Sequence, residues 1–334
     1  MKVLCGDIGG TNTRLALFEV AGTVLEILEE ETYKSRESPS LEIIVSEFLQ
    51  KRRISAPLPG CFGIAGPIKE GICQATNLPW VVQLSKLVFE LQTERVYLLN
   101  DLQANAYGIL ALHEDDFVVL NPGNSAAKGN AAVISAGTGL GEAGLYWDGI
   151  QYRPFACEGG HASFSPGNEL QVGLLRFLFK RFGHVSWERV ISGQGFLNIY
   201  EFLCEYRNFT PSKRLVDEMQ KGDPAAVVTK EGFSGRCQVC GEALDIFACL
   251  YGAEAGNLAL KIMATGGVYI GGGIAPKIIE KLRGPHFMEG FLKKGRMQDL
   301  LEGIPVKVIL NDQAALFGTA QYMRTVMKEH SCSS

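Results

Sequence analysis

The chain has 334 residues, of which 46% are apolar and 20% are charged, and its net charge is −4. These proportions are near the averages of globular proteins, and the length predicts about two domains. Without an excess of basic residues there is no basic face for nucleic acid, so no nucleic-acid partner is expected. No apolar run reaches the ~18 residues that cross a membrane, and no charged-then-apolar leader precedes the first strand. We therefore expect a soluble, cytoplasmic protein that does not enter a membrane.

The first predicted strands enclose a glycine turn. Residues 3–18 read as an apolar strand that meets Asp7, a turn through Gly9, Gly10 and Thr11, and a second strand. Glycines let a backbone turn tightly, and successive exposed N–H groups bind anions. Because a carboxylate repels phosphates, Asp7 beside such a turn indicates an intervening Mg²⁺, which carboxylates and phosphates hold together. The alternative interpretation is a plain β-hairpin.

Strand and helix patterns alternate along the rest of the chain, which is typical of an α/β protein. The first half predicts a hairpin turn at Ala21–Gly22, a helix over 39–52, and strands over 60–65 and 95–99. Further helices are expected over these ranges: 168–182, 186–203, 237–265 and 276–282.

A second glycine turn, Gly137-Thr138-Gly139, again lies between two predicted strands. Here Gly139-x-Gly141-x-x-Gly144 matches the dinucleotide-binding fingerprint, but that fingerprint requires a helix directly after the glycines. A strand and a two-residue hairpin turn at Asp148–Gly149 are predicted instead, so we reject dinucleotide binding.

The sequence Leu-Asn-Asp also occurs twice, at 99–101 and at 310–312. Each copy follows an apolar strand and opens a predicted helix, the first ending at about residue 112 and the second covering 313–329. The paired turns and paired helix starts predict a duplicated architecture of two lobes joined by two crossing helices. We expect residues 1–111 with 313–334 to form a small α/β domain and 112–312 a large one.

Asp101 is the candidate catalytic base. Phosphoryl transfer to an alcohol needs a carboxylate that accepts the hydroxyl proton, and strand ends open into clefts in α/β sheets. The alternative is a helix N-cap, a position that Asp and Asn favour for backbone reasons alone. Asp312 has the same local context and provides a natural comparison.

Two further groups of residues are candidates for ligand binding. The glycines of 266–274, Gly272 among them, would let an adenine ring approach the backbone, or would serve a close packing turn. Glu158 and His161 on a short glycine turn, with Glu188, provide the acceptors and donors that recognise sugar hydroxyls. For Glu188 the alternative is a favourable interaction with a helix dipole.

The nine cysteines are scattered, several of them in apolar runs, which is typical of small buried side chains in a reducing compartment. Cys237 and Cys240 form a single CxxC pair. A zinc site would need a second pair or two histidines at suitable spacing, so a helix start is favoured over a metal or redox role.

Six motifs carry a resemblance that covers almost the whole chain. They are Gly6-Asp7-Ile8-Gly9-Gly10-Thr11-Asn12, Leu99-Asn100-Asp101, Ala136-Gly137-Thr138-Gly139-Leu140-Gly141, Glu158-Gly159-Gly160-His161, the segment 183–193 and Gly271-Gly272-Gly273-Ile274. In order and spacing the chain resembles the bacterial-type glucokinases, ATP:glucose phosphotransferases of the actin-like sugar kinase superfamily. The resemblance implies a two-lobed, ribonuclease H-like α/β fold with the active-site cleft between a small and a large domain.

The resemblance also implies roles for individual residues. Asp101 would accept the proton of the glucose 6-hydroxyl, and Asn100, Asp101, Glu158, His161 and Glu188 would bind the sugar. Asp7 would hold Mg²⁺ through water. ATP would be bound by Gly6, Asp7, Ile8, Gly9, Gly10, Thr11, Gly137, Thr138, Gly139 and Gly272. The enzymes of this family are homodimers that close two lobes over the sugar. The zinc-binding cysteine cluster of related kinases is missing after Gly160-His161, so no zinc is implied.

Two alternatives remain open. The first is a kinase for another hexose, such as fructose, mannose or an N-acetylated hexosamine. The second is an ATP-dependent regulatory module on the same actin-like scaffold, which would turn over ATP without forming a sugar phosphate.

Overall fold

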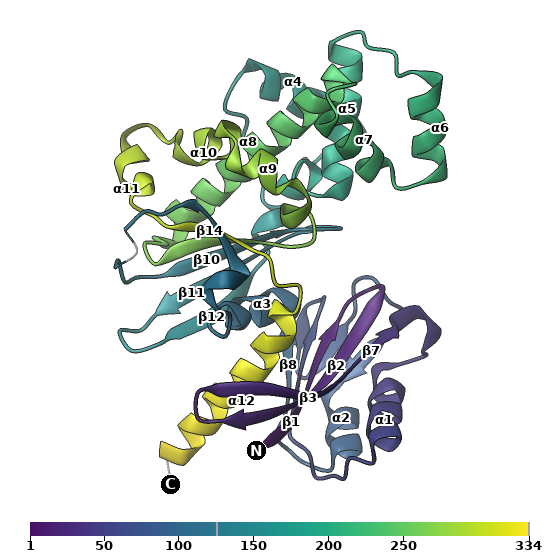
Figure 1. The fold of residues 1–334 in the computed structure, drawn as a ribbon, viewed down its shortest axis with the longest axis vertical. Helices are drawn as coiled ribbons and strands as arrows, with labels where there is room; N and C mark the ends of the chain where they lie inside the picture. Colours follow the sequence, from purple (N-terminus) through teal and green to yellow (C-terminus); the bar gives the residue numbers. More distant parts are fainter. Residues whose placement is uncertain (125, 333–334) are drawn as a thin grey trace. The chain divides into compact units, whose positions relative to one another are not determined.

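The computed structural model describes residues 1–124 and 126–332, and the chain divides into two compact units (Figure 1). Unit 1 comprises residues 1–116, 154–156 and 311–334. Unit 2 comprises residues 117–153 and 157–310.

The central sheet of unit 1 has the strand order β3-β2-β1-β4-β8. The strands are β1 Lys2–Ile8, β2 Asn12–Ala21, β3 Val24–Lys34, β4 Gly60–Ile64 and β8 Val96–Asn100. β1, β2 and β3 pair antiparallel, whereas β4 is parallel to β1 and β8 is parallel to β4. A small second sheet contains β5 Ile68–Lys69, β6 Ile72–Gln74 and β7 Val81–Gln83.

Strand β1 contributes to two hydrophobic cores, because successive side chains of a strand point to opposite faces. Leu4 and Ile8 belong to the core that contains the buried residues of α1 (Leu41–Arg52) and α2 (Leu84–Leu91). Val3 and Cys5 belong to the core that contains those of α3 (Asp101–Ile109) and α12 (Ala314–Cys332). Burial on both faces explains why β1 reads as an apolar run over residues 3–5 and does not alternate with polar residues there.

Helices α3 and α12 pack directly against each other in unit 1 (Figure 1). A Cβ on Gly318 would collide with the backbone of Ala104, and a Cβ on Gly108 would collide with that of Ala314. The two glycines therefore permit a close backbone approach, which is the crossing of paired helices that the repeated Leu-Asn-Asp motif predicts.

The sheet of unit 2 has the order β12-β11-β10-β13-β14-β9. Its strands are β9 Phe117–Asn121, β10 Ala131–Ala136, β11 Leu140–Trp147, β12 Tyr152–Cys157, β13 Gly267–Gly271 and β14 Val306–Ile309. As in unit 1, an antiparallel hairpin with a glycine turn is followed by two parallel strands. The predicted duplication is confirmed at the level of sheet topology.

Helices make up most of the rest of unit 2 (Figure 1). They are α4 Glu169–Phe182, α5 Gly193–Tyr206, α6 Lys213–Lys221, α7 Pro224–Phe233, α8 Gln238–Ile262, α9 Ile279–Arg283, α10 Pro285–Leu292 and α11 Gln298–Glu302. The long helix α8 runs through the core, where the buried Tyr251 hydroxyl accepts the N–H of Ala136 at 3.1 Å and reaches the carbonyl of Gly271 at 3.1 Å. This side chain ties the ends of β10 and β13 together.

Several predicted boundaries are wrong. Residues 186–203 form a 3-10 turn, Trp187–Arg189, and then α5, because the Ser192 hydroxyl caps a new helix by accepting the N–H of Gly195 at 2.9 Å. Helix α3 ends at Ile109, short of residue 112, and 276–282 divides between a 3-10 turn and α9. The first hairpin turn lies at Gly22–Thr23, one residue later than predicted, with Gly22 at a φ of 59°.

The hairpin between β11 and β12 also differs from the prediction. Four residues, 148–151, connect the strands, whereas a two-residue turn is expected at Asp148–Gly149. The Asp148 carboxylate accepts the N–H groups of Ile150 at 2.9 Å and Gln151 at 2.8 Å. These side-chain bonds stabilise a wider turn, which Asp favours by bonding to the backbone that follows it.

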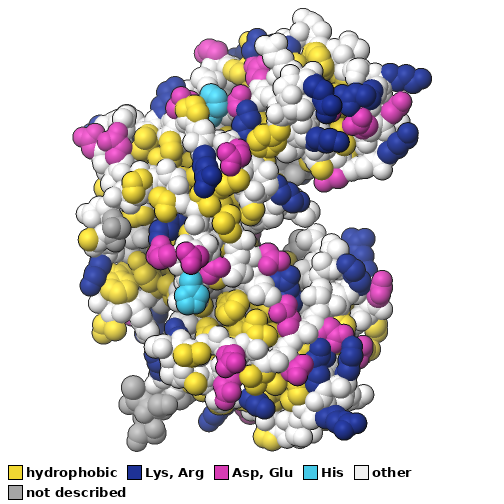
Figure 2. All heavy atoms as spheres, viewed as in Figure 1, with side chains coloured by type: hydrophobic (Ala, Val, Ile, Leu, Met, Phe, Trp, Pro, Cys, Tyr) yellow, Lys and Arg dark blue, Asp and Glu magenta, His cyan; other side chains and the backbone are white. Residues whose placement is uncertain are grey.

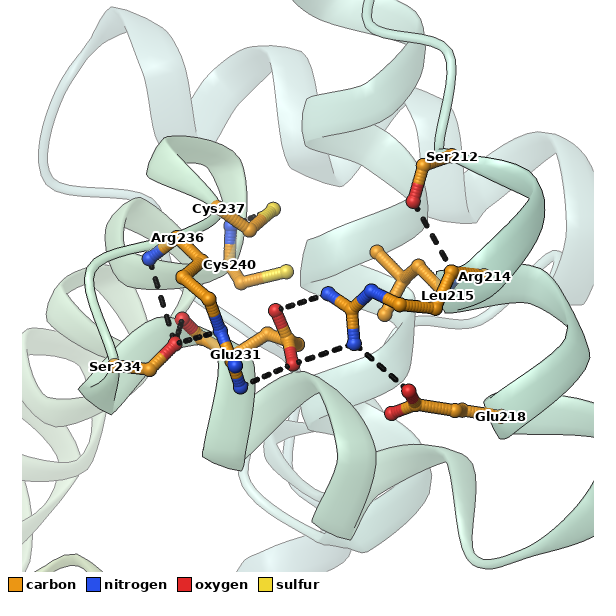
Figure 3. Close-up of polar contacts among 9 residues, drawn as sticks. All are labelled: Ser212, Arg214, Leu215, Glu218, Glu231, Ser234, Arg236, Cys237 and Cys240. Atoms are coloured by element: carbon orange, nitrogen blue, oxygen red, sulfur yellow. Dashed lines mark hydrogen bonds and ion pairs between the residues drawn. The ribbon is translucent and has the colours of Figure 1, made fainter.

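The Cys237-x-x-Cys240 pair begins helix α8 (Figure 3). Cys237 Sγ accepts the N–H of Cys240 at 3.3 Å, both side chains are buried, and burial raises the pKa of Cys240. Beside them the buried Glu231 of α7 binds Arg214 at 2.8 Å and Arg236 at 2.8 Å. These contacts hold α6, α7 and the start of α8 together. The surroundings of the Cys pair therefore serve the packing of these helices.

Lys and Arg side chains are interspersed with Asp and Glu on the face drawn in Figure 2. Within the described residues, no helix has the length and apolar character that crossing a membrane requires.

Candidate active site

The glycine turn of unit 1 is held by a residue that sequence reasoning did not identify, Ser35. Its hydroxyl donates to the carbonyl of Gly9 at 2.7 Å, and its N–H donates to the carbonyl of Thr11 at 3.0 Å. Gly9 closes the turn by donating to the carbonyl of Asn12 at 2.9 Å. Among the described residues no acceptor takes the N–H of Gly10 or Thr11. Two backbone donors of a fixed turn are therefore available to an anion.

Not every residue of this motif belongs to the turn. Gly6 and Ile8 lie within β1 and are buried, with Gly6 opposite Leu15 and Phe62 in the ladder. A Cβ on Gly6 would collide with the ring of Phe62, so sheet packing accounts for that glycine. The part of the motif that can reach a ligand is the turn over residues 9–11.

Asp7 is a carboxylate in an unfavourable environment. Burial raises its pKa to about 6, the Arg14 guanidinium lowers the pKa, and the Asp312 carboxylate raises it. Arg14 donates to Asp312 at 3.0 Å, so its charge is shared between the two acids. A further positive charge next to Asp7 would favour its ionised form, as a bound cation would.

Asn100, not Asp101, caps helix α3. The Asn100 Oδ1 accepts the N–H of Leu102 at 2.9 Å, and its amide donates to the carbonyl of Gly66 at 3.3 Å. Asn311 makes the equivalent bond in the turn before α12, accepting the N–H of Gln313 at 2.9 Å. These backbone bonds account for the Asn of each motif but not for the Asp that follows it. Asp101 is half-buried in the first turn of α3.

The glycine turn of unit 2 is held from several sides. Gly137 donates to the carbonyl of Gly139 at 2.8 Å and accepts the N–H of Gly193 from α5 at 2.9 Å. Gly272, at a φ of 83°, lies against the backbone of Ala136, where a Cβ would collide. The close packing explains this glycine, and it places the 271–273 turn directly beside the 137–139 turn. In the described residues no acceptor takes the N–H of Thr138 or Gly139.

The predicted sugar-binding residues of unit 2 are grouped around the start of β11. Glu188 Oε2 accepts the N–H of Leu140 at 3.0 Å. The Glu158–His161 turn packs on β11, because a Cβ on Gly160 would collide with the carbonyl of Leu140. His161 Nε2 lies 3.8 Å from Glu158 Oε2, and both side chains are exposed. Since Glu188 lies in a three-residue 3-10 turn, a helix dipole does not account for it.

Strand β11 thus connects the nucleotide and sugar candidates of this unit. It leaves the 137–139 turn, contacts Glu188 at Leu140, and underlies the glycine turn that carries Glu158 and His161. In unit 1, Asp7 lies one residue before the end of β1, and Asp101 directly follows the end of β8. In each unit the candidate residues therefore lie at or beside the ends of strands in the repeated sheet.

Comparison with known proteins assigns the family. The glucokinase family model matches residues 4–326. The glucokinase of Nostoc sp. (strain PCC 7120) is 42% identical over 333 residues, covering 95% of this chain and 97% of the relative. The chain belongs to the glucokinase family. The glucokinase of Salmonella paratyphi B is 34% identical, with 97% of each chain covered.

Solved structures agree with this glucokinase assignment. A crystal structure of a glucokinase from an Antarctic psychrotroph has a TM-score of 0.86 and 31% identity, covering 97% of this chain and 99% of that one. A ROK family glucokinase from Streptomyces griseus, in complex with glucose and AMPPNP, has a TM-score of 0.63 at 19% identity, covering 97% and 100%. The predicted actin-like sugar kinase fold is confirmed, and the chain is an enzyme of the glucokinase family.

Proposed function

We propose that this chain transfers the γ-phosphoryl group of ATP to O6 of glucose, with Asp101 as the general base. Membership of the glucokinase family supports the reaction. One observation supports the base: Asn100 supplies the cap of α3, so capping does not account for the carboxylate of Asp101. Asp101 would orient the 6-hydroxyl and accept its proton as the oxygen attacks phosphorus in line.

The phosphates of ATP would be bound by backbone donors of two turns. We assign them to the 9–11 turn with the motif Gly6, Asp7, Ile8, Gly9, Gly10 and Thr11, and to Gly137, Thr138 and Gly139, with Gly272 beside them. The support is that the N–H groups of Gly10, Thr11, Thr138 and Gly139 have no acceptor among the described residues. The neighbour that holds AMPPNP supports the use of ATP.

Asp7 fits a role toward Mg²⁺. Among the described residues no cluster of three or more His, Cys, Asp or Glu side chains could hold a metal. Mg²⁺ needs no such cluster, because it keeps several waters and binds one or two carboxylates and the substrate's phosphates. The half-buried Asp7, with its raised pKa, is an oxygen donor that gains from a nearby cation. When bound, the ion would neutralise charge on the phosphates, and Asp7 would hold it through water.

We assign the sugar hydroxyls to Asn100, Glu158, His161 and Glu188. Support comes from the exposure of Glu158 and His161 on one short turn, and from the bond of Glu188 to Leu140 of β11, the strand on which that turn packs. Glu188 keeps its second carboxylate oxygen for a hydroxyl, since only Oε2 accepts Leu140. Planar acceptors and a two-sided imidazole suit a polyol because each unpaired buried hydroxyl costs free energy.

The decisive experiment compares Asp101→Asn with Asp312→Asn. Asp101→Asn should lower kcat by about 10²–10⁴-fold, the usual contribution of a positioned base. Its glucose affinity should stay close to wild type, because the side chain keeps its size and polarity. Asp312→Asn repeats the change at the equivalent helix start, where the carboxylate pairs with Arg14, and should retain kcat. Near-wild-type turnover of Asp101→Asn would exclude Asp101 as the base.

A sugar panel separates the remaining alternatives. ADP release would be measured with glucose, fructose, mannose and an N-acetylated hexosamine, and the sugar phosphate identified by mass spectrometry. We expect glucose to give the highest kcat/KM. Equal ADP release without any sugar, and with no sugar phosphate formed, would favour a regulatory ATPase. We further propose a homodimer that works in the cytoplasm, and the free state of the described cysteines fits a reducing compartment.

A further inference from the structure

The most unusual acidic group outside the candidate site is Glu142, on strand β11. Its side chain is only 1% exposed, and no donor among the described residues reaches its Oε1. Its carboxyl group lies within hydrogen-bonding range of Glu254 of α8, which is 0% exposed. Two buried carboxylates can make such a contact only when one of them carries a proton, because two bare acceptors repel each other.

The surroundings decide which acid keeps the proton. Glu254 accepts the amide of Asn257 at 2.7 Å and the ammonium of Lys261 at 3.0 Å, so its negative charge is compensated. Lys294 lies behind this pair and donates to Asn257 Oδ1 at 2.6 Å. Among the described residues Glu142 has no such partners. The proton of the pair therefore belongs to Glu142, which donates to the Glu254 carboxylate.

The same carboxyl group supports the predicted sugar-binding turn. A Cβ on Gly159 would collide with Oε2 of Glu142, so the Gly159 backbone lies directly on this carboxyl. Gly159 separates Glu158 from Gly160 and His161 in the 3-10 turn. The Glu142 carboxyl therefore contacts the backbone segment to which Glu158 and His161 are attached.

We propose that protonated Glu142 is a positioning residue, which holds the Glu158–His161 turn in its glucose-binding conformation through its hydrogen bond to Glu254. This inference rests on the proposed sugar-binding role of that turn. Ionisation would place two negative carboxylates against each other in the core of unit 2. The Glu142 carboxyl would then be pushed toward the side that it can reach, which is the Gly159 backbone.

The charges around Glu142 set the pH at which its carboxyl group loses the proton. Burial and the Glu254 carboxylate raise the pKa of Glu142 to about 7, while Lys261 lowers it. From β12 the titratable group that faces it is Cys157, and from α8 the Tyr251 phenol also faces it. Because the proton is present below the pKa and lost above it, glucose affinity should fall as the pH rises through 7.

Glucose binding and steady-state kinetics from pH 6 to pH 8.5 would test the inference, with wild type and Glu142→Gln compared. The Gln side chain has the shape of the protonated acid and can donate to Glu254 at every pH. In the wild type, the dissociation constant and KM for glucose should rise by up to about 30-fold, the limit for a group of pKa 7 that must be protonated. In Glu142→Gln the dissociation constant and KM for glucose should stay low and nearly constant. The KM for ATP should vary with pH in the same way in the wild type and in the variant.

The outcomes are distinct. Parallel glucose profiles for wild type and Glu142→Gln would overturn the inference. If Glu142→Gln does not fold, wild-type glucose binding followed by tryptophan fluorescence decides alone, because an affinity that is constant from pH 6 to pH 8.5 would also overturn it. In support, the infrared band of a protonated carboxyl group should be present at pH 6 and lost by pH 8.5. A wild type that phosphorylates no glucose at any pH would instead refute the proposed function.

Discussion

At the scale of single residues, the Asn and the Asp of each Leu-Asn-Asp motif have different roles. Asn100 and Asn311 each accept the backbone N–H two residues ahead, at or just before the start of a helix, and these bonds do not account for the aspartate that follows. Asp312, in the second copy of the motif, pairs with Arg14. Asp101, in the first copy, is the proposed base. A single sequence cannot separate such copies, because the local residues are identical and the difference arises from what each carboxylate faces.

Asp7 provides a residue-scale prediction. Asp7→Asn should raise the KM for Mg·ATP at least about tenfold, equivalent to the loss of ~1.4 kcal/mol, because the neutral amide attracts a cation less. Glucose affinity should not change. Since the carboxyl is held with its pKa raised to about 6, the ionised side chain opposes folding above that pH, and the variant should melt at a higher temperature at pH 8. Kinetics with varied Mg·ATP and thermal unfolding measure the two effects, and loss of glucose binding alone would contradict the assignment.

At the scale of elements, glycines mark the places where backbones meet. Gly108 and Gly318 lie at the crossing of α3 and α12, Gly159 and Gly160 lie where the 3-10 turn meets β11, and Gly272 lies against β10. The hydrophobic pattern predicts that the elements exist, but not which surfaces touch. For that reason the sequence interpretation of Gly272 leaves nucleotide approach and close packing equal, and only the contact with Ala136 reveals the packing.

The helix crossing gives an element-scale prediction. Gly318→Ala should destabilise the protein by about 1–3 kcal/mol, as overpacking does, because its methyl group meets the backbone of Ala104. Gly241→Ala is the matched control, since this glycine of α8 has its nearest neighbour at 3.8 Å. There the change should stabilise by about 0.5–1 kcal/mol through helix propensity. Urea denaturation of both variants measures the difference, and equal effects would contradict the close crossing.

At the scale of the whole molecule, the chain contains two versions of one sheet topology. In the orders β3-β2-β1-β4-β8 and β12-β11-β10-β13-β14, a glycine hairpin is followed by two parallel strands at the same positions. Unit 2 adds α4 to α11, and with them the Glu231 cluster at the start of α8 (Figure 3). The repeated part carries the predicted phosphate turns, whereas the predicted sugar residues Glu158, His161 and Glu188 belong to unit 2 alone.

The proposed homodimer is a prediction at this scale. Sedimentation equilibrium should give twice the chain mass of 36.4 kDa at micromolar concentrations, because the proposal requires a stable association. The measurement should be repeated with glucose and with Mg·ATP, to see whether the association depends on ligands. A mass of one chain at every concentration, in an active preparation, would refute the homodimer and leave the proposed reaction intact.

The amino-acid order alone was enough to predict the α/β class, the duplicated turns and helix starts, and the family, because each depends on short motifs that keep their order along the chain. It also predicted the candidate residues Asp7, Asp101, Glu158 and Glu188. The packed structure was needed to show that Ser35 holds the first turn and that Glu142 and Glu254 meet in the core. These contacts join residues far apart in the chain, so they exist only after the strands and helices have packed. The choice of Asn100 over Asp101 as the cap is a local one, but both residue types favour that position, so only the observed bond to Leu102 identifies it.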